Sequence, residues 1–404
     1  MRVLLVHNFY GSEAPSGEAT VFHAEKALLL KRGVTVSQYT RSSDQIRRQG
    51  VWGKIQGGIA SIWNPFAAAA LLRTVSTFKP DVVHVHNTFP LISPSIYWAL
   101  RDLDCAVVLT LHNYRSLCAA ATLERGGEPC TMCIEKRSVL PAFRYGCYRS
   151  SRAATAPLAA SISLHKRLRT LARCVDTFIA LTPFQKSMHV RGGLPEDRIF
   201  IKPQFYENPP LPQPWSRRTG QIGFVGRLSH EKGPDLLLEA WRRLGEQAPE
   251  LAVLGDGPLR SSLVDFVGKH GLQNRVDIMG GKSFEETQAL LGSLRLLVVP
   301  SRYFEGFPMV IREAYAWGVP VLAADLGSLH DLVIPGATGG LFAPNDPASL
   351  QQRVQELWGD PARLEELSIG ARTLFDRELT AEVNFVRLMD IYSASIAHKR
   401  SRRA

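Results

Sequence analysis

Two carboxylates and a proline that can start a helix lie close together in residues 300–321. A strand is expected just before this segment, and a helix is expected to begin near Pro308, because proline suits a first helical turn. The free N–H groups and partial positive charge of a helix start favour an anion such as a diphosphate. Glu313, farther along the helix, could accept two hydroxyl hydrogens from a ribose, and Glu305 could accept them from a sugar. The segment therefore predicts a site for a sugar joined to a diphosphate.

The positive charge that a diphosphate requires is offered by residues 226–233, which contain Arg227 and Lys232. This stretch follows the first expected strand of the second half of the chain, where folds of this kind bind phosphate. Arginine offers a fork of donors and lysine a point charge, so the two could clamp the diphosphate. The alternative is that these residues, like most surface charges, are simply solvated.

The first half offers a glycine and three histidines. Gly17, at an expected helix start, permits close approach of the backbone to a phosphate. His112 follows an expected strand directly, and by itself this position is that of a loop histidine with satisfied hydrogen bonds. His84 lies inside a strand, which favours a structural role, and His86 is open to either interpretation.

The elements that must position these residues alternate between short apolar strands and amphipathic helices, which predicts parallel sheets covered by helices. The four prolines in 208–214 cannot enter a helix or sheet interior and indicate a linker. We expect two doubly wound, Rossmann-like domains facing a cleft: an N-terminal acceptor-side domain (1–207), a linker (208–218), a C-terminal nucleotide-sugar domain (219–380), and a last helix with a basic tail (381–404) that packs back on the first domain. Strands are expected at 3–6, 34–39, 82–86, 107–111 and 177–181, and at 222–225, 251–254, 276–278, 296–299 and 321–323.

The composition is that of a globular protein, and its charge is uneven. Apolar residues make up 45% and charged residues 21% of 404, and no apolar run approaches the ~20 residues of a membrane span. The apolar run at the start is too short for a signal peptide, which favours a cytoplasmic protein. Residues 1–210 carry 26 Lys+Arg and 14 Asp+Glu, a net +12, whereas residues 211–404 carry 22 and 23, a net −1. The first half is therefore expected to face something anionic.

The second half resembles glycosyltransferase family 4, the group 1 glycosyltransferases. The matching pieces are Gly226-Arg227…Lys232-Gly233, Leu254-Gly255-Asp256-Gly257-Pro258, and Pro300-Ser301…Glu305-Gly306-Phe307-Pro308…Glu313-Ala314…Gly318-Val319-Pro320-Val321. The first half resembles the family more loosely, through Pro15-Ser16-Gly17-Glu18, where Ser16 replaces a glycine common in the family, and through Asp81–Asn87 and Thr110–Asn113.

The resemblance implies the GT-B fold and a retaining transfer of a sugar from a nucleotide-sugar donor, with UDP- or GDP-sugars favoured. It implies diphosphate contacts for Arg227 and Lys232, a ribose contact for Glu313 and a donor-sugar contact for Glu305, and it places His112 near the donor sugar. The remaining donor-binding residues that it implies are Gly17, Gly255, Met279, Gly280, Gly306 and Phe307. It further implies that no catalytic metal is required, and that the acceptor is a sugar or a lipid-linked sugar used in building bacterial surface polysaccharide, lipopolysaccharide or glycolipid.

Two other functions remain open at this point. A sugar-nucleotide epimerase would use the same two-domain plan without transfer. A nucleic-acid-binding protein is suggested only by the basic half and the tail from Lys399 to Arg403, without a nucleic-acid motif.

Four of the six cysteines have spacing that suits a structural zinc ion. Cys130 and Cys133 form a CxxC pair, which Cys118 and Cys147 flank, and Gly126 and Gly127 within the insert indicate a turn. The alternative is four reduced thiols without a metal, since spacing alone does not determine tetrahedral geometry.

Two segments of the first half suggest contact with an anionic membrane on its cytoplasmic face. Residues 47–63 mix arginine and lysine with tryptophan and isoleucine, a combination suited to a lipid interface. Residues 163–175 carry leucines at helical spacing with basic residues off that stripe, although such a stripe can equally pack on its own domain.

Overall fold

The computed structural model describes residues 1–11 and 16–402, and within these the chain divides into two compact units. The first contains residues 1–123, 130–203 and 384–404, and the second contains 124–129 and 204–383. Pro15 of the glycine-containing stretch and Arg403 of the basic tail lie outside the described residues.

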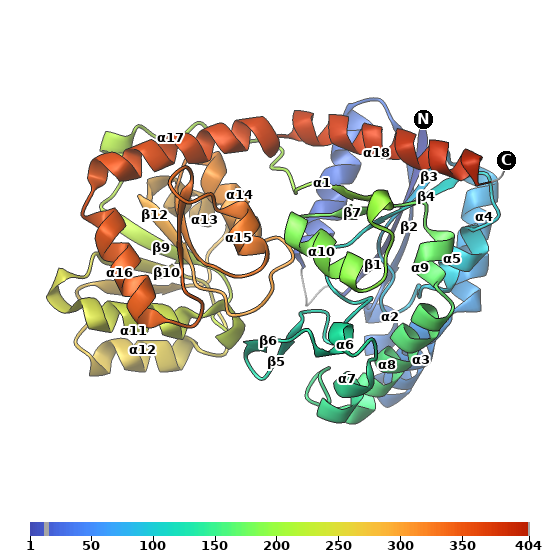
Figure 1. The fold of residues 1–404 in the computed structure, drawn as a ribbon, viewed down its shortest axis with the longest axis horizontal. Helices are drawn as coiled ribbons and strands as arrows, with labels where there is room; N and C mark the ends of the chain where they lie inside the picture. Colours follow the sequence, from blue (N-terminus) through green and yellow to red (C-terminus); the bar gives the residue numbers. More distant parts are fainter. Residues whose placement is uncertain (12–15, 403–404) are drawn as a thin grey trace. The chain divides into compact units, whose positions relative to one another are not determined.

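The first unit is built on a six-stranded parallel sheet in the order β2-β1-β3-β4-β7-β8 (Figure 1). Its strands are β1 (Arg2–Phe9), β2 (Thr35–Ser42), β3 (Val82–Asn87), β4 (Ala106–Thr110), β7 (Thr177–Ala180) and β8 (Ile199–Ile201). Its longer helices are α1 (Gly17–Lys31), α3 (Gly50–Ile62), α4 (Pro65–Phe78), α8 (Arg152–Arg167), α10 (Pro183–Arg191) and α18 (Ala381–Ser401, of which residues 384–401 belong here). Its short helices are α2 (Asp44–Arg47), α5 (Ser95–Leu100), α6 (Met132–Glu135), α7 (Leu140–Tyr145) and α9 (Thr170–Cys174).

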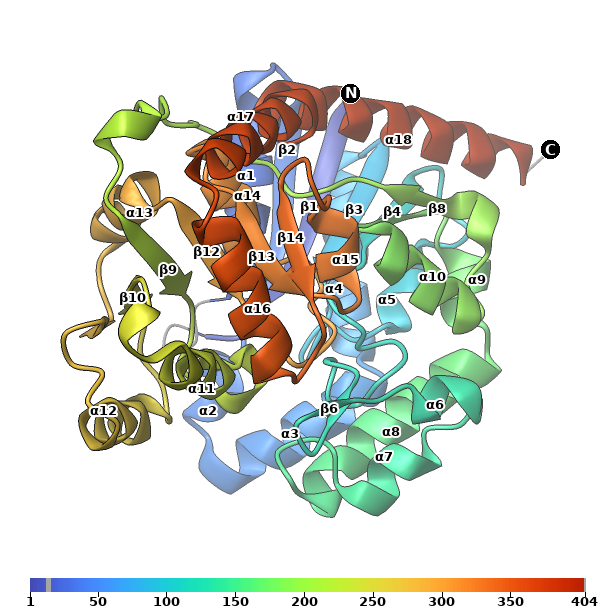
Figure 2. The ribbon, with the colours of Figure 1, turned by 60° about the vertical axis from the view of Figure 1, so that its left-hand side comes forward.

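Alternation along β1 sends side chains to opposite faces of this sheet, and both faces are covered. Leu4 and Val6 pack with side chains of α4, α5 and α9 on one face. Val3 and Leu5 pack on the other face with α1 and with Leu388, Ile391 and Tyr392 of α18. Figure 2 shows α18 running along this unit, so the C-terminal part of the chain supplies part of its core.

The second unit has a parallel sheet in the order β11-β10-β9-β12-β13-β14. Strands β10 and β11 lie on one side of β9, and β12, β13 and β14 lie on the other, so the order of strand addition switches sides between β9 and β12. Its strands are β9 (Gln221–Val225), β10 (Glu250–Leu254), β11 (Val276–Gly280), β12 (Leu296–Val299), β13 (Val321–Ala324) and β14 (Gly339–Phe342). Its helices are α11 (Pro234–Leu244), α12 (Arg260–Lys269), α13 (Phe284–Ser293), α14 (Met309–Ala316), α15 (Ser328–Leu332), α16 (Pro347–Trp358) and α17 (Pro361–Glu378). Two parallel-sheet α/β units confirm the predicted fold class.

Three features differ from the sequence-based expectation or were not foreseen by it. The edge strands β8 and β14 were not predicted. Residues 163–175 do not form one helix: α8 ends at Arg167, Arg169 adopts a left-handed conformation (φ 54°), and α9 follows. The hairpin β5–β6 (Glu124–Arg125 and Glu128–Pro129), inserted within the first half of the chain, groups with the second unit.

Candidate nucleotide-sugar site

A close ion pair of the second unit lies at the switch point of its sheet, between β9 and β12. Lys232 follows β9 and Glu305 follows β12, and Lys232 Nζ lies 2.6 Å from Glu305 Oε1. Ligands of open α/β sheets bind at such a switch point, beyond the carboxyl ends of the strands. The sequence is suited to this approach at Gly233, where an added Cβ would lie 2.2 Å from the Pro300 carbonyl oxygen. Lys232, predicted to bind the diphosphate, and Glu305, predicted to bind the sugar, are therefore in direct contact.

Two neighbours fix the Glu305 carboxylate, which is only 4% exposed. Ser301 Oγ donates to Oε1 at 2.7 Å and Tyr303 OH donates to Oε2 at 2.6 Å. Burial by itself would lower the pKa of Lys232, but the adjacent Glu305 carboxylate and Tyr303 raise it above its ordinary value. Lys232 therefore remains a cation, and Glu305 remains directed toward it. Sequence reasoning did not assign Ser301 and Tyr303, although both lie in the segment that it singled out.

Glu313 lies on α14 and is largely buried. Gln288 Nε2 donates to Glu313 Oε2 at 3.2 Å, and Arg312 Nη2 lies 3.3 Å from Oε1. Trp317 Nε1 in turn donates to Gln288 Oε1 at 2.9 Å, which holds the amide in its orientation. Burial raises the pKa of Glu313, and Arg312 opposes that shift. Gln288 and Arg312 are further residues that spacing along the sequence did not identify.

The other predicted residues of this unit follow neighbouring strands at the same edge of the sheet. Arg227 is exposed after β9, and Gly255 follows β10 with its N–H donating to the Gly280 carbonyl oxygen at 3.0 Å. Gly255 has φ 147°, and a Cβ there would lie 1.8 Å from the Gly226 carbonyl oxygen, so a side chain is excluded. Met279 is the next-to-last residue of β11 and is half-buried, and Gly280 ends the strand. Gly306 and Phe307 follow Glu305, and Phe307 packs against the core of the unit.

Gly17 and His112 belong to the first unit. Gly17 begins α1, and Ser16, which replaces a glycine of the family pattern, caps that helix by accepting from the Ala19 N–H at 3.3 Å. His112 follows β4, and its Nε2 lies 3.0 Å from Nδ1 of His86. The structure therefore assigns both His84 and His86 to a hydrogen-bonded, buried set of side chains adjoining His112, in which His84 Nε2 lies 2.7 Å from Thr110 Oγ1.

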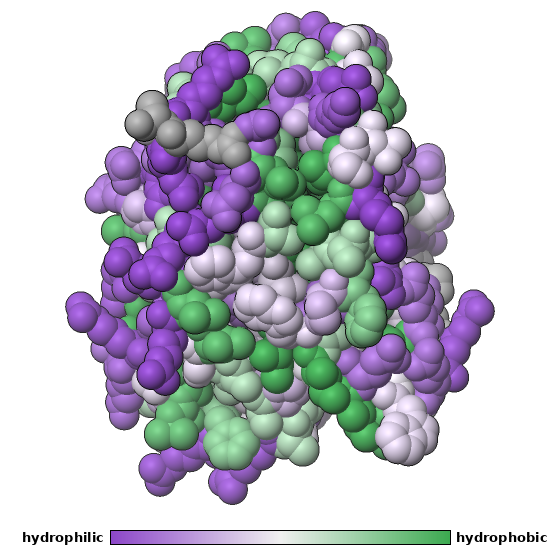
Figure 3. Space-filling model, turned by 90° about the vertical axis from the view of Figure 1, so that its right-hand side faces the viewer, coloured by the Kyte–Doolittle hydropathy of each residue, from purple (hydrophilic) through white to green (hydrophobic). Residues whose placement is uncertain are grey.

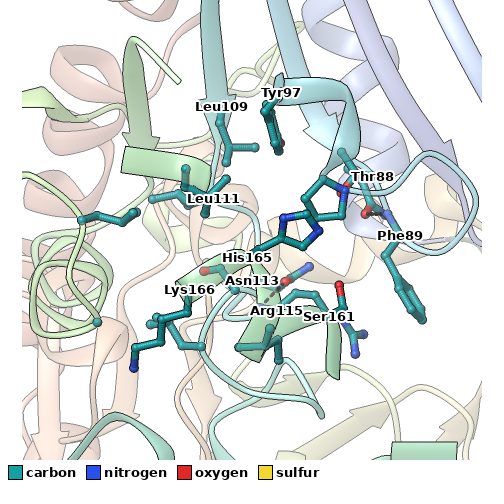
Figure 4. A pocket seen from close by; sticks show the side chains of 18 of the residues that line it. Thr88, Phe89, Tyr97, Leu109, Leu111, Asn113, Arg115, Ser161, His165 and Lys166 are labelled. Atoms are coloured by element: carbon teal, nitrogen blue, oxygen red, sulfur yellow. Dashed lines mark hydrogen bonds between the residues drawn. The ribbon is translucent and has the colours of Figure 1, made fainter. Parts of the chain in front are cut away.

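The first unit contains a cavity of about 350 Å³ at the ends of β3 and β4, with His112 in its wall. Figure 4 shows aliphatic and aromatic side chains on one side of it, including Tyr97, Leu109 and Leu111. Polar and basic side chains, among them Arg115 and Lys166, line the remainder. The cavity can therefore receive a ligand that is apolar in one part and anionic in another.

Comparison with known proteins identifies the family of the chain. Residues 213–374 match the sequence profile of the glycosyl transferases group 1, and residues 15–207 match that of glycosyltransferase family 4. The two matches together cover most of the chain, and the chain belongs to the group 1 (family 4) glycosyltransferases, as the sequence motifs predicted.

Individual relatives are similar over part of their length. An uncharacterized glycosyltransferase of Methanocaldococcus jannaschii is 37% identical over 134 residues, 33% of this chain and 37% of that protein. Glycogen synthase of Mycobacterium tuberculosis is 35% identical over 159 residues, 38% of each chain. This chain thus matches well under half of the length of either relative.

Solved structures show the GT-B fold over nearly the whole chain. HepE of Anabaena in complex with UDP has a TM-score of 0.67 at 16% identity, covering 98% of this chain and 100% of that one. The same protein has been solved with UDP-glucose, with a TM-score of 0.61 at 16% identity, covering 97% of this chain and 100% of that one. Members of this group generally need no catalytic metal.

The cysteines predicted to bind zinc all belong to the first unit. Burial raises the pKa of Cys133 to about 11, and the neighbouring thiols of Cys118, Cys130 and Cys147 add to the shift. Among the described residues, however, the only three potential ligands within 4.8 Å of one another are Glu25, His84 and His86. The thiols are therefore near one another without being drawn into a tetrahedral set, and zinc remains a prediction.

Metal analysis tests the zinc prediction. Protein purified without chelator is expected to contain about one zinc per chain, because four thiolates would satisfy a structural site. Cys130→Ser is expected to lose the metal, whereas Cys174→Ser, a buried cysteine outside the four, should retain it. Zinc far below one equivalent in the unsubstituted protein would leave four reduced thiols as the correct interpretation.

Proposed function

We propose that the protein transfers a sugar, with retention of anomeric configuration, from a nucleotide-diphosphate sugar to an acceptor. The observation that carries this proposal is the contact between Lys232 and Glu305 at the switch point between β9 and β12. In this contact a fixed cation lies beside a fixed carboxylate, at the position where such folds bind phosphate, and we assign the carboxylate to the sugar hydroxyls. The complexes of HepE with UDP and UDP-glucose support a UDP-sugar as donor, with a GDP-sugar as the second choice.

The chemistry assigned to this site is stabilisation of the leaving group. As the bond between the anomeric carbon and the diphosphate oxygen breaks, negative charge grows on the diphosphate, and Lys232 and Arg227 offset it. The acceptor oxygen bonds to the anomeric carbon from the same face, and its proton passes to the departing phosphate. Glu313 accepts hydroxyl hydrogens of the ribose, and Glu305 accepts those of the donor sugar.

A donor screen tests the function directly. Thermal unfolding is measured with UDP-, GDP- and dTDP-glucose, and one of them is expected to stabilise the protein by about 2.7 kcal/mol at 100 times its Kd. The stabilising donor is then incubated with acceptors, and the product is identified by mass spectrometry. A changed sugar nucleotide without transfer would favour an epimerase, and binding of DNA without any nucleotide sugar would favour the nucleic-acid alternative.

For the acceptor we propose a lipid-linked sugar phosphate, used in assembling a bacterial surface polysaccharide or glycolipid at the inner face of the cytoplasmic membrane. The cavity beside His112 supports this class, since apolar residues and the basic Arg115 and Lys166 share its wall. Ser161 and His165 of the same wall hold the end of α3, with Ser161 Oγ donating to the Ser61 carbonyl oxygen at 2.8 Å. The ring of His165 also stacks on Trp63 at 5.6 Å. The cavity and α3 are therefore parts of one packed arrangement.

The polarity of α3 is the reverse of an ordinary surface helix. Its buried positions are small (Gly53, Gly57, Ala60 and Ser61), and a Cβ at Gly53 would lie 1.8 Å from the Ile46 carbonyl oxygen. Its large apolar side chains face outward instead, and those of α3 and the start of α4 are Val51, Trp52, Ile55, Ile59, Trp63 and Phe66. Figure 3 shows hydrophobic residues gathered on the lower part of one face, bordered by hydrophilic ones.

The occupant that we propose for this outward face is an anionic membrane. Trp52 is 78% and Phe66 is 83% exposed, and the exposed basic residues Arg48 and Lys54 accompany them. Aromatic and basic side chains together suit the boundary between headgroups and acyl chains. Among the described residues, no single helix is long and apolar enough to cross a bilayer, although α3 and α4, bent by 63°, pass that test as a pair. Because the backbone breaks at Arg169, residues 163–175 do not form one continuous helix that could lie along the membrane surface.

Vesicle co-sedimentation tests the membrane surface. Trp52→Ser with Phe66→Ser is expected to lower partition into anionic vesicles about 100-fold, because each large apolar side chain contributes about 1.5 kcal/mol or more when buried. Binding should also weaken at ~1 M salt, where the Debye length falls to ~3 Å. Phe284→Ser, an exposed aromatic residue of the second unit, is the matched control and should bind like the unsubstituted protein. Equal partition into neutral vesicles, or no partition at low salt, would contradict the assignment.

A further inference from the structure

A buried carboxylate organises the polar residues next to His112. Glu25 of α1 is 1% exposed, and its Oε2 accepts from Lys202 Nζ at 3.0 Å. Its Oε1 lies 3.0 Å from His84 Nδ1 and 3.3 Å from His86 Nε2. Lys202 Nζ also donates to Asn384 Oδ1 at 3.0 Å, so the ammonium is held between two acceptors. All of these residues belong to the first unit.

Glu25, His84 and His86 offer three potential metal ligands within 4.8 Å, but the surroundings favour hydrogen bonds over a metal. The Lys202 ammonium already neutralises the Glu25 carboxylate. His84 uses both ring nitrogens, because Nε2 lies 2.7 Å from Thr110 Oγ1 and Nδ1 lies within reach of both Glu25 and Tyr392 OH. A cation in this space would be repelled by the ammonium that is already present.

The position of each proton follows from the carboxylate. The Glu25 carboxylate attracts a hydrogen and repels a lone pair, so the ring nitrogen of His86 that lies 3.3 Å from it, Nε2, carries the hydrogen, although the geometry of this contact is not that of a hydrogen bond. His86 Nδ1 is then an acceptor, and it faces His112 Nε2 at 3.0 Å. His112 must therefore carry its hydrogen on Nε2, which leaves the lone pair on Nδ1.

His112 is neutral in this setting, so its tautomer decides what it can do. Burial, with the neighbouring His86, holds the pKa of His112 well below its ordinary value. A neutral imidazole with its hydrogen on Nε2 presents an acceptor at Nδ1, and the opposite tautomer would present a donor.

We propose that Glu25 and His86 are positioning residues that fix His112 in the tautomer whose Nδ1 accepts a hydroxyl hydrogen from the bound sugar. This inference rests on the proposed function only for the identity of the sugar. The tautomer itself follows from the carboxylate beside His86 and from the hydrogen bond between His86 and His112, and it can be observed without any substrate.

Glu25→Gln is the informative substitution because it preserves the shape of the side chain and replaces only one accepting oxygen by a donating NH₂ group. Lys202 requires an acceptor, so the amide oxygen is expected to turn toward Lys202 and the NH₂ group toward the histidines. His86 Nε2 then accepts, His86 Nδ1 donates to His112 Nε2, and His112 carries its hydrogen on Nδ1. One substitution thus inverts two tautomers in sequence.

The measurement is ¹⁵N NMR of histidine-labelled protein, with the His112 resonances identified by their loss in His112→Asn. The unsubstituted protein is expected to show His112 protonated on Nε2, and Glu25→Gln on Nδ1. Tyr392→Phe removes a hydroxyl beside His84 without touching the path from Glu25 to His112, and it should leave the tautomer unchanged. Circular dichroism verifies that each variant is folded.

Turnover is measured in parallel with the donor found by the screen. Glu25→Gln is expected to lower kcat about 100-fold, as loss of one preorganised contact does, with little change in the donor KM. An unchanged His112 tautomer in Glu25→Gln would overturn the inference even if the protein transfers sugars. An inverted tautomer with unaltered kcat would overturn the use of Nδ1 for the sugar. A tightly bound metal lost on His84→Ala would overturn the hydrogen-bonded chain in favour of a metal site.

Discussion

Replacing Lys232 by alanine is expected to reduce kcat/KM of glycosyl transfer about 30- to 1,000-fold, which corresponds to roughly 2–4 kcal/mol of transition-state stabilisation. The ammonium is held by Glu305 at 2.6 Å and is oriented before any donor arrives. Negative charge on the diphosphate, already present in the bound donor, grows as the bond breaks, so the loss should fall on kcat as well as on donor binding. Initial rates with the screened donor measure the effect.

The same substitution removes the partner of a buried carboxylate, and this second effect must be separated from the first. Breaking such a pair can cost ~3–5 kcal/mol of stability. Thermal unfolding of Lys232→Ala therefore accompanies the kinetics, and rates are taken well below its Tm. Lys282→Ala, an exposed lysine of the same unit paired with Glu286 at 3.5 Å, serves as the control. Turnover of a folded Lys232→Ala at the unsubstituted rate would remove Lys232 from the proposed site.

The first unit is expected to lose stability steeply as the pH falls below 6.5. Burial lowers the pKa of His7 to about 3, with the charges of His86 and His23 adding, and burial lowers that of His189 to about 4. Each histidine takes up a proton below pH 6.5 in the unfolded chain but not in the folded one, so falling pH favours unfolding. The effect of each is about 1.36 kcal/mol per pH unit in this window.

His7→Leu tests this pH dependence with a predictable sign. Within residues 1–11 and 16–402, neither ring nitrogen of His7 has a hydrogen-bond partner, and its ring stacks on Phe22 with 5.0 Å between centroids, so leucine breaks no hydrogen bond there. The difference in free energy of unfolding, variant minus unsubstituted protein, should be about 2 kcal/mol more favourable to the variant at pH 5 than at pH 7. His23→Leu, an exposed residue of the same unit, should change the slope far less. Parallel stability curves for His7→Leu and the unsubstituted protein between pH 7 and 4 would refute the argument.

Periodicity predicted the main strands because their signal is strong. Val3–Val6 and Leu296–Val299 are continuous apolar runs, as strands buried on both faces must be. The edge strand Ile199–Ile201 is only three residues long, and Gly339–Phe342 begins with two glycines, so neither stands out from a loop. Arg169 adopts a left-handed backbone conformation just after α8. A glycine or asparagine at this position would have predicted the helix end, but an arginine does not.

The site was predictable where its residues form local motifs and unpredictable where the sheet brings them together. Arg227, Lys232, Glu305 and Glu313 lie in short stretches with a recognisable order. Glu25 and Lys202 are 177 residues apart along the chain, and their pairing required the packing of α1 against the sheet. The chain from Glu25 to His112 depends on β3 lying beside β4, which no spacing along the sequence encodes.

The docking of α18 has a consequence for synthesis of the protein on the ribosome. Domains are commonly completed in order, with the N-terminal one first. Here Leu388, Ile391 and Tyr392 belong to the same core cluster as Val3 and Leu5, and Asn384 helps to hold Lys202. The first unit therefore starts to emerge long before it can close, whereas the second has all of its residues once Val383 has emerged. The unit begun first is therefore completed after the second one, and until α18 has emerged, part of one face of its sheet stays uncovered.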